Sequence, residues 1–447
     1  MSHALVPSAG DVSEADHNAR LEQIAALPEM GTDNITAPES MVAKLSTALG
    51  AVGVVGLLVT IVGAFVVNTP HALAAFEVGL FTVTAASLGC LALTMILHAV
   101  NAGFHITARR VMEKIASMLP ICMLGVLVVL VIELLPIHGP EGHVGSGVLL
   151  TWLRPEMQSS HILEIKSPFL NVPFLIVRFL IYAALWSFLS LRLLGWSTRQ
   201  DRTGDRSLSR RMRFTSSWGL LAFALSLAFF SFDFLMSQDF RFFSTMWGVY
   251  FFAISALAGI SLTALVLAVL RASGRLTGVV TPEHFHDLGK LVFAFTCFWG
   301  YIAFSQYFLI WYSNIPEETH WFIHRQSNGW KTLFVLLAFA HFVVPFVLFV
   351  SRVPKRSTLG LAFMGVWMLV VTVLDVIFII RPMVYTGTDW TPALEAATPA
   401  NWWLDVFGII GAFGIYGFFL VRKLGSGTLI PTKDPFLPEA LAHKNYV

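Results

Sequence analysis

The first apolar stretch of the chain reads STALGAVGVVGLLVTIVGAFVVN over residues 46–68 and contains no charged side chain. A helix of about 20 apolar residues crosses the hydrocarbon core of a bilayer. The residues before this stretch are polar and acidic, and they have neither the basic start nor the short apolar core of a signal peptide. We therefore expect residues 46–68 to form an uncleaved membrane-spanning helix.

The same pattern recurs along the chain and predicts an all-α integral membrane protein with about ten transmembrane helices. The other nine predicted spans are 74–102, 114–135, 171–194, 215–236, 244–271, 288–312, 329–351, 359–381 and 402–424. No soluble domain is indicated. The chain therefore divides into an N-terminal tail (1–45), a membrane domain (46–424) and a C-terminal tail (425–447), and both tails are too short to form a core of their own.

The composition agrees with a lipid environment, because 56% of the residues are hydrophobic and only 13% are charged. Soluble domains carry about a quarter charged residues. The net charge of +2 gives no sign of a nucleic-acid partner. The three cysteines form no CxxC or CxxCH motif, so the chain shows no sequence for an iron–sulfur cluster or a c-type haem of its own.

The distribution of the 29 lysines and arginines predicts the orientation. Most of them fall on the side that carries both chain termini, including the arginine-rich segment 192–213. The other side has only Arg154, Lys166, Arg241, Arg325, Lys331 and Arg381. Because cytoplasmic loops carry the excess of positive charge, we predict that both termini are cytoplasmic.

The opposite side has three longer loops, at 136–170, 313–328 and 382–401, and many tryptophans. These tryptophans are Trp152, Trp247, Trp311, Trp321, Trp330, Trp390, Trp402 and Trp403. One interpretation is a folded outer surface that receives a partner. The simpler interpretation, which we favour for the tryptophans alone, is anchoring at the membrane interface.

Ionisable residues inside the predicted spans are the candidate functional residues, because a charge in lipid is costly. A rise of about 1.5 Å per residue places Arg178, Asp233 and Asp375 in the outer third of the membrane, His341 near its centre and His98 towards the cytoplasmic side. Two interpretations stay open. Arg178 and Asp233 can form a buried ion pair between adjacent helices, or the set can form a proton path or a quinone headgroup site.

The histidines do not suggest a metal centre. His98 and His341 differ in predicted depth by about 15 Å, too far to ligate one b-type haem between them. His284 and His286 lie in a short segment without further convincing ligands. We predict no metal site and no cofactor bound by this chain.

Three stretches carry a family resemblance: KSPFLNVPFLIVRFLIYAALW (166–186), FFSFDFLMSQDFRFFSTMWGVYFFA (229–253) and LGKLVFAFTCFWGYIAFSQYFLIWYSNIPEETHWFIHR (288–325). They resemble the F-type membrane subunits (ActF) of bacterial alternative complex III, in the NrfD/PsrC-like family. The hydropathy pattern fits this family from the first helix to the last. The resemblance implies two four-helix bundles, made of helices 2–5 and 6–9, flanked by helices 1 and 10.

The resemblance also implies a function and a location. It places the chain in the bacterial inner membrane, in a complex that oxidises quinol or menaquinol and passes electrons to cytochrome c or to a terminal oxidase. The implied partners are a paralogous NrfD-like membrane subunit, a multihaem cytochrome c, an iron–sulfur protein, small membrane subunits and lipids. Haem c and iron–sulfur clusters belong to those partner subunits.

Five residues are the predicted proton-path or quinone-pocket set: His98, Arg178, Asp233, His341 and Asp375. Arg178 and Asp233 lie within the family-like stretches, whereas the other three rest on their intramembrane position. The alternative function is a purely structural scaffold that docks the periplasmic cytochrome and iron–sulfur subunits. A secondary transporter is a third hypothesis, but no pair of Gly/Pro-broken helices stands at matching positions in the two halves.

Overall fold

The protein is an all-helical membrane protein, and its computed structural model describes residues 14–103, 105–138, 144–327, 329–385 and 401–445. Ten helices in this part of the chain are long and apolar enough to cross a membrane, as predicted. They are α3 (Glu39–Val66), α4 (Thr69–Ala99), α5 (Ile106–Ala116) with α6 (Leu119–Leu134), α8 (Val172–Thr203), α9 (Ser207–Phe234), α10 (Trp247–Ala272), α11 (Pro282–Ser313), α13 (Trp330–Leu337) with α14 (Val344–Val350), α16 (Thr358–Ile380) and α17 (Trp402–Leu424).

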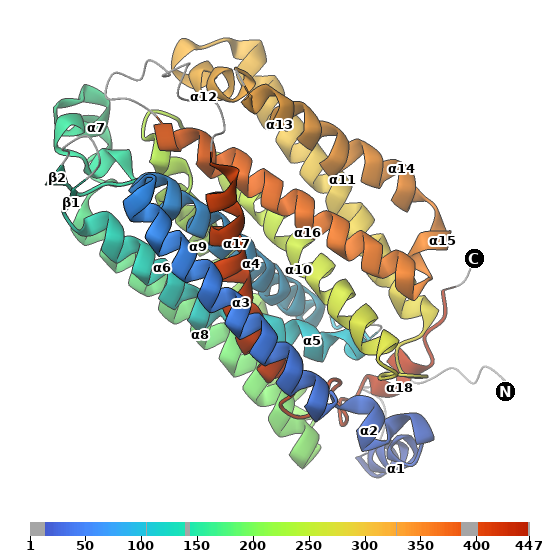
Figure 1. Ribbon diagram of the computed structural model, residues 1–447. Helices are drawn as coiled ribbons and strands as arrows, with labels where there is room; N and C mark the ends of the chain where they lie inside the picture. Colours follow the sequence, from blue (N-terminus) through green and yellow to red (C-terminus); the bar gives the residue numbers. More distant parts are fainter. Residues whose placement is uncertain (1–13, 104, 139–143, 328, 386–400, 446–447) are drawn as a thin grey trace.

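The ten helices form two four-helix bundles and one flanking pair (Figure 1). In bundle 1, α4 packs against α5–α6 and α9, and α8 packs against α6 and α9. In bundle 2, α10 packs against α11 and α16, and α13–α14 completes the group. The flanking helices α3 and α17 lie along each other and against α4. This is the arrangement of helices 2–5 and 6–9 that we expected.

The short elements gather at the two ends of the helices. We call the end that carries both termini the basic end, and the opposite one the tryptophan-rich end (Figure 1). At the basic end lie α1 (Glu14–Ala25), α2 (Thr32–Ile35), α15 (Arg352–Lys355) and α18 (Leu437–Leu441). At the other end lie α7 (His161–Lys166), α12 (Pro316–Gln326) and a pair of two-residue antiparallel strands, β1 (Ile137–His138) and β2 (Val144–Gly145).

Several helices are longer than their apolar spans. The helix α8 continues to Thr203 rather than ending near 194, and α9 begins at Ser207 rather than 215. Hydropathy marks where lipid contact ends, whereas the helix stops only where the backbone is capped. Here Gly204 takes the left-handed conformation at φ 69°, and its N–H donates to the carbonyl of Gln200. The hairpin therefore extends beyond the apolar part of the bundle.

The anchoring interpretation holds for only some of the tryptophans. Trp152, Trp247, Trp321 and Trp330 are buried at 1–4% exposure, inside the protein rather than at its surface. Trp311, Trp402 and Trp403 are exposed at 42–63%, as interfacial anchors are. Trp390 lies outside the described residues. Tertiary packing decides which indoles face lipid, and spacing along the sequence does not reveal it.

The two bundles meet where α4 crosses α10 with almost no space between their backbones. A Cβ built on Gly89 would lie 1.8 Å from the carbonyl oxygen of Ser255, and one on Gly259 would lie 2.7 Å from the backbone nitrogen of Cys90. Small residues allow this approach in membrane helices, where close packing replaces the hydrophobic effect. The crossing fixes the position of each bundle against the other.

Both terminal segments run across the basic end. The N–H of Leu429 donates to the carbonyl of Ile35 at 2.7 Å, and that of Leu276 donates to Asn34 at 2.9 Å. Further along, the carbonyl of Ala440 bonds to the ring of His284 at 2.9 Å. The C-terminal segment thus joins α11 of bundle 2 to the N-terminal segment.

Candidate functional site

The predicted Arg178–Asp233 pair is present and connects α8 to α9. The guanidinium donates from Nε to one carboxylate oxygen at 2.9 Å and from Nη2 to the other at 2.7 Å. The Tyr182 hydroxyl donates to the same carboxylate at 2.8 Å. The guanidinium carbon also lies 4.0 and 4.1 Å from the ring centres of Phe169 and Phe174. The bidentate geometry favours a permanent ion pair.

Asp375 on α16 lies in a different setting, in the interior of bundle 2. The Tyr250 hydroxyl from α10 donates to one carboxylate oxygen at 2.5 Å, and the Trp299 indole N–H from α11 donates to the other at 2.8 Å. Asp375 is 0% exposed. Its two hydrogen-bond donors are neutral, so the carboxylate has no arginine or lysine partner among the described residues.

His341 completes this cluster from the eighth membrane-spanning helix. Its imidazole stacks on the Trp299 ring with centres 3.7 Å apart, and its Nδ1 lies 3.6 Å from a carboxylate oxygen of Asp375. Neither ring nitrogen has a hydrogen-bond partner among the described residues, although the side chain is fully buried. A buried polar group left in this way is uncommon and points to a functional position.

The backbone around His341 departs from an α-helix. Residues Ala338–Val343 form a π-helical segment between α13 and α14. Pro345 has no N–H to donate, and the indole of Trp367 supplies a bond to the carbonyl of Ala340 at 2.9 Å. Single π-helical turns are frequent at functional sites because the extra residue redirects a side chain. Here the turn lies at the residue that faces Asp375.

The two bundles therefore present a matched pair of aspartates with different partners. Asp233 lies near the end of the fourth helix of bundle 1, and Asp375 lies in the corresponding part of the fourth helix of bundle 2. Arg178 neutralises the first with a guanidinium that stays protonated at any physiological pH. The second faces the Tyr250 hydroxyl, the Trp299 indole and the His341 imidazole, and none of these groups carries a permanent charge. Of the two aspartates, Asp375 is therefore the one without a permanently charged partner among the described residues.

A cavity lies directly beside the bundle 2 cluster. Its volume is about 530 Å³, and its wall is almost entirely apolar. Tyr250 and Trp299 form part of this wall, while Asp375 lies behind them and accepts hydrogen bonds from both. Gln306 also lines the cavity. A small number of polar groups in an apolar cavity is typical of ligand sites.

The helix α12 closes one side of this cavity and is held in place by Arg325. Trp321 and Phe322 of α12 line the cavity. The Arg325 side chain donates to the carbonyls of Phe378 at 2.8 Å and Ile379 at 2.6 Å, near the end of α16. Burial lowers the pKa of Arg325 to about 9. This arginine acts as a cap on α16 and positions the cavity wall.

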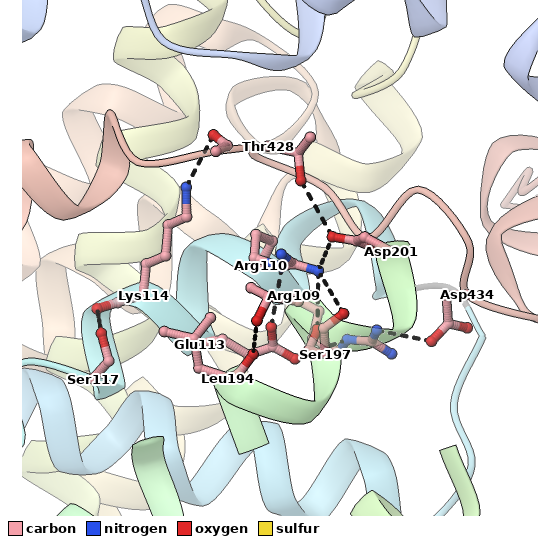
Figure 2. A network of polar contacts seen from close by, with 12 residues as sticks. Arg109, Arg110, Glu113, Lys114, Ser117, Leu194, Ser197, Asp201, Thr428 and Asp434 are labelled. Carbon is pink, nitrogen blue, oxygen red and sulfur yellow. Dashed lines mark hydrogen bonds and ion pairs between the residues drawn. The ribbon is translucent and has the colours of Figure 1, made fainter. Parts of the chain in front are cut away.

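The remaining predicted residue, His98, lies in bundle 1 near the basic end, apart from both aspartates. Its Nε2 is 4.0 Å from the Glu113 carboxylate of α5. Glu113 is bound by Arg109 at 3.1 Å and by Arg110 at 3.2 Å (Figure 2). The five predicted residues thus occupy three separate places, and only His341 with Asp375 adjoins the cavity.

The charged residues of α5 form a buried network that the sequence did not indicate (Figure 2). The sequence places Arg109, Arg110 and Lys114 on the side that carries the termini, and the structure shows that each is at most 2% exposed. The C-terminal segment and α8 cover them. Asp434 binds Arg109 at 2.8 Å and Asp201 binds Arg110 at 2.7 Å.

The buried network contains equal numbers of basic and acidic side chains, and it also binds the C-terminal segment. Lys114 donates to the backbone carbonyls of Leu424 at 3.1 Å and Gly427 at 3.4 Å, so it helps to hold the C-terminal segment. Nearby, burial and then the charge of Arg109 lower the pKa of His105 to about 3. Three basic and three acidic side chains share this interior, which favours a structural role for the network.

Two further groups of buried polar side chains join helices that are distant in the sequence. Arg381 binds Asp405 in a bidentate pair at 2.5 and 3.1 Å, and His71 approaches the same carboxylate at 3.0 Å. Arg381 is the last residue of the predicted span 359–381, on the side opposite the termini, and it is 0% exposed. Glu77 accepts a bond from Gln238 at 2.9 Å. No spacing pattern predicts such pairs, because their members come from distant helices.

The segment Glu283–Asp287 (EHFHD), which contains His284 and His286, has a structural role in the described structure. The ring of His284 receives the N–H of Thr281 at 3.0 Å and lies within hydrogen-bonding distance of the Ala440 carbonyl. It therefore caps α11 and receives the C-terminal segment. Within the described residues, no group of three or more His, Cys, Asp or Glu side chains is arranged to hold a metal ion.

A histidine–aspartate contact joins α12 to the end of bundle 1. His320 Nε2 lies 2.8 Å from the Asp239 carboxylate. Burial alone lowers the pKa of His320, but the hydrogen bond and the charge of Asp239 more than reverse this, so its pKa is raised. A histidine with a raised pKa stabilises the folded state below its unfolded pKa, and this stabilisation is lost as the pH rises through the folded value.

We expect the midpoint of thermal unfolding to fall as the pH rises from about 6.5, because the charged His320–Asp239 contact is then lost. The contribution is about 1 kcal/mol or less, since the imidazole is partly exposed. Replacing His320 with glutamine should remove this component, as measured by thermal unfolding in detergent at several pH values. An identical pH dependence in the variant would contradict the prediction.

In comparisons with known proteins, no protein-family model and no curated protein matches the chain.

Proposed function

We propose that this chain is a membrane subunit of a quinol-oxidising respiratory complex of the alternative complex III type. In this proposal bundle 2 holds a quinol next to a proton acceptor, and the electrons pass to haem c or iron–sulfur centres of partner subunits. The orientation follows the positive-inside rule, so the cavity lies towards the periplasmic side of a bacterial inner membrane. The resemblance of the three sequence stretches supports the assignment to this type of complex.

One observation carries the proposal: an apolar cavity adjoins a buried carboxylate that has neutral donors and a histidine as partners. A quinol headgroup is planar and carries two hydroxyl groups, while its tail is apolar. The aromatic wall fits such a ring, and Tyr250 and Gln306 provide polar contacts. The volume of about 530 Å³ is within the range of ligand sites in proteins.

The chemistry requires somewhere for protons to go. Oxidation of a quinol to a quinone releases two electrons and two protons. The Tyr250 hydroxyl lies between the cavity and Asp375, so it can relay a proton from a ligand hydroxyl to the carboxylate. The next polar group is His341, whose Nδ1 lies 3.6 Å from a carboxylate oxygen of Asp375. In this scheme Trp299 is a positioning residue, because it holds both the imidazole and the carboxylate.

The test is to replace Asp375 with asparagine in the whole complex. The variant keeps the shape, and its amide oxygen can accept from the Trp299 indole while its amide N–H donates to the Tyr250 hydroxyl. It cannot accept a proton, so we expect quinol oxidation to fall about 100-fold, the lower range for a lost general base. Electron transfer from decylubiquinol to the acceptor and proton release are measured on complex reconstituted in liposomes. His341→Gln should give a similar loss.

The matched control is Thr372→Val, one turn away on α16. This threonine is also buried and bonds only the carbonyl of Met368 in its own helix. Its substitution perturbs the packing but removes no titratable group, so the rate should stay close to that of the wild type. If Asp375→Asn assembles normally and oxidises quinol at the wild-type rate, the proposed role of Asp375 is wrong and the result supports the structural scaffold instead.

A further inference from the structure

The turn that joins α8 to α9 carries an unusual density of positive charge. Between residues 192 and 213 the sequence has seven arginines, two aspartates and no lysine. These arginines are Arg192, Arg199, Arg202, Arg206, Arg210, Arg211 and Arg213. Six are exposed and Arg206 is partly exposed. We call residues 192–213 the arginine hairpin.

The two aspartates of the arginine hairpin leave most of the charge of its seven arginines uncompensated. Asp201 turns inward and binds the buried Arg110 at 2.7 Å (Figure 2). Asp205 accepts the N–H and the hydroxyl of Ser207, each at 2.8 Å, at the start of α9. These hydrogen bonds lower the pKa of Asp205, and the charges of Arg211 and Arg199 contribute less. The outward-facing arginines therefore keep an excess of positive charge.

The arginines stand where the lipid-facing surface of both helices ends. On α8 the exposed Phe188 and Leu191 are followed one turn later by Arg192 and Gly195. On α9 the exposed Phe214, at 74% exposure, lies three and four residues after the exposed Arg211 and Arg210. Residues three or four apart share one face of a helix. The apolar stripes thus change to guanidinium groups towards the turn, which is the order expected where a membrane helix leaves the lipid core.

Gly195 leaves a position without a side chain on the exposed surface of α8 among these arginines, and we call this position the notch. A Cβ built at Gly195 meets no atom within 4 Å. Arg192 and Arg199 flank it at three and four residues' distance, on the same helical face. The Arg192 guanidinium lies 4.5 Å from the ring centre of Trp196, which holds it beside the notch. The position is open, flanked by positive charge and close to the membrane level.

We propose that the arginine hairpin binds anionic phospholipids, with a phosphate at the Gly195 notch between Arg192 and Arg199. Guanidinium groups bind phosphate oxygens in bidentate fashion, and clusters of four to eight basic residues beside a membrane helix attract anionic lipids. An acidic protein would also match the charge. The adjoining apolar stripes favour a ligand that is both anionic and apolar, and they receive the acyl chains. This inference is independent of the proposed function.

The experiment compares lipid binding by the purified full-length protein in nanodiscs. The hairpin variant is Arg192→Gln/Arg199→Gln/Arg213→Gln, and the control variant is Arg271→Gln/Arg275→Gln/Arg352→Gln, three basic residues of the same end outside the hairpin. The ligands are cardiolipin, phosphatidylcholine and inorganic phosphate. We expect the hairpin variant to bind cardiolipin about 100-fold more weakly, and the control variant to lose much less.

Two further measurements sharpen the result. Gly195→Leu fills the notch without changing charge, so it should weaken cardiolipin binding while the melting temperature in phosphatidylcholine stays the same. Inorganic phosphate at equal concentration should not compete, since it lacks acyl chains. The proposal is overturned if the wild type binds cardiolipin no more tightly than phosphatidylcholine. It is also overturned if both triple variants lose the same amount of cardiolipin affinity, or if Gly195→Leu binds cardiolipin as tightly as the wild type.

Discussion

Replacing Arg178 with leucine is expected to destabilise the protein by about 3–5 kcal/mol, because it leaves the Asp233 carboxylate buried without its cation. The carboxylate is 0% exposed and would retain only the Tyr182 hydroxyl as a side-chain donor at 2.8 Å. The free energy of unfolding is measured by denaturant titration of the purified protein in detergent micelles. Arg352→Leu, which removes an exposed arginine, serves as the control.

The double variant separates the ion pair from the packing. In Arg178→Leu/Asp233→Asn both charges are gone, so no uncompensated charge remains in the interior. We expect the double variant to recover most of the stability that the single variant lost. If the double variant is as unstable as Arg178→Leu, the loss comes from the packing of the guanidinium between Phe169 and Phe174, and the ion-pair explanation is wrong.

Replacing Gly89 with alanine should prevent the two bundles from packing as they do. The added methyl group would stand 1.8 Å from the carbonyl oxygen of Ser255, and this neighbour is backbone that cannot move aside alone. Overpacking of a tight core typically costs about 1–3 kcal/mol, and a contact with backbone is expected at or above the upper end. We expect a lower unfolding temperature and a large loss of monodisperse protein in size-exclusion chromatography.

The same substitution elsewhere provides a matched control. Gly195 also lies within a membrane-spanning helix, but a Cβ there meets nothing within 4 Å. Gly195→Ala should leave the unfolding temperature unchanged or raise it slightly, since alanine favours the helix over glycine. Equal effects of the two alanine variants would show that helix propensity dominates and that the α4–α10 crossing is not as close as described.

The contrast between the bundles gives each of them a separate role. Bundle 1 is held by the Arg178–Asp233 pair and by the charged network of α5, and these groups are tied in ion pairs. Bundle 2 has its aspartate beside neutral donors and an imidazole without hydrogen bonds among the described residues. We infer that bundle 1 is the more rigid support and that the proposed chemistry belongs to bundle 2.

The sequence by itself determined the number of helices and the residues worth testing. Uninterrupted apolar stretches give ten membrane-spanning helices because lipid permits no other backbone arrangement except a closed barrel. Arg178, Asp233, His341 and Asp375 stood out as candidates because an ionisable side chain inside lipid is costly. Depth along a helix follows from counting residues, so these predictions needed no structure.

Only the tertiary structure decided which of these residues meet. Depth does not specify the direction of a side chain, and contacts between helices depend on how every other face packs. The structure therefore separated Arg178–Asp233 from His341–Asp375, and it revealed the cavity beside the second pair. It also buried Arg109 and Arg381, which the sequence had placed between two predicted spans and at the end of one. Their burial depends on segments far away in the chain, and hydropathy is a local property.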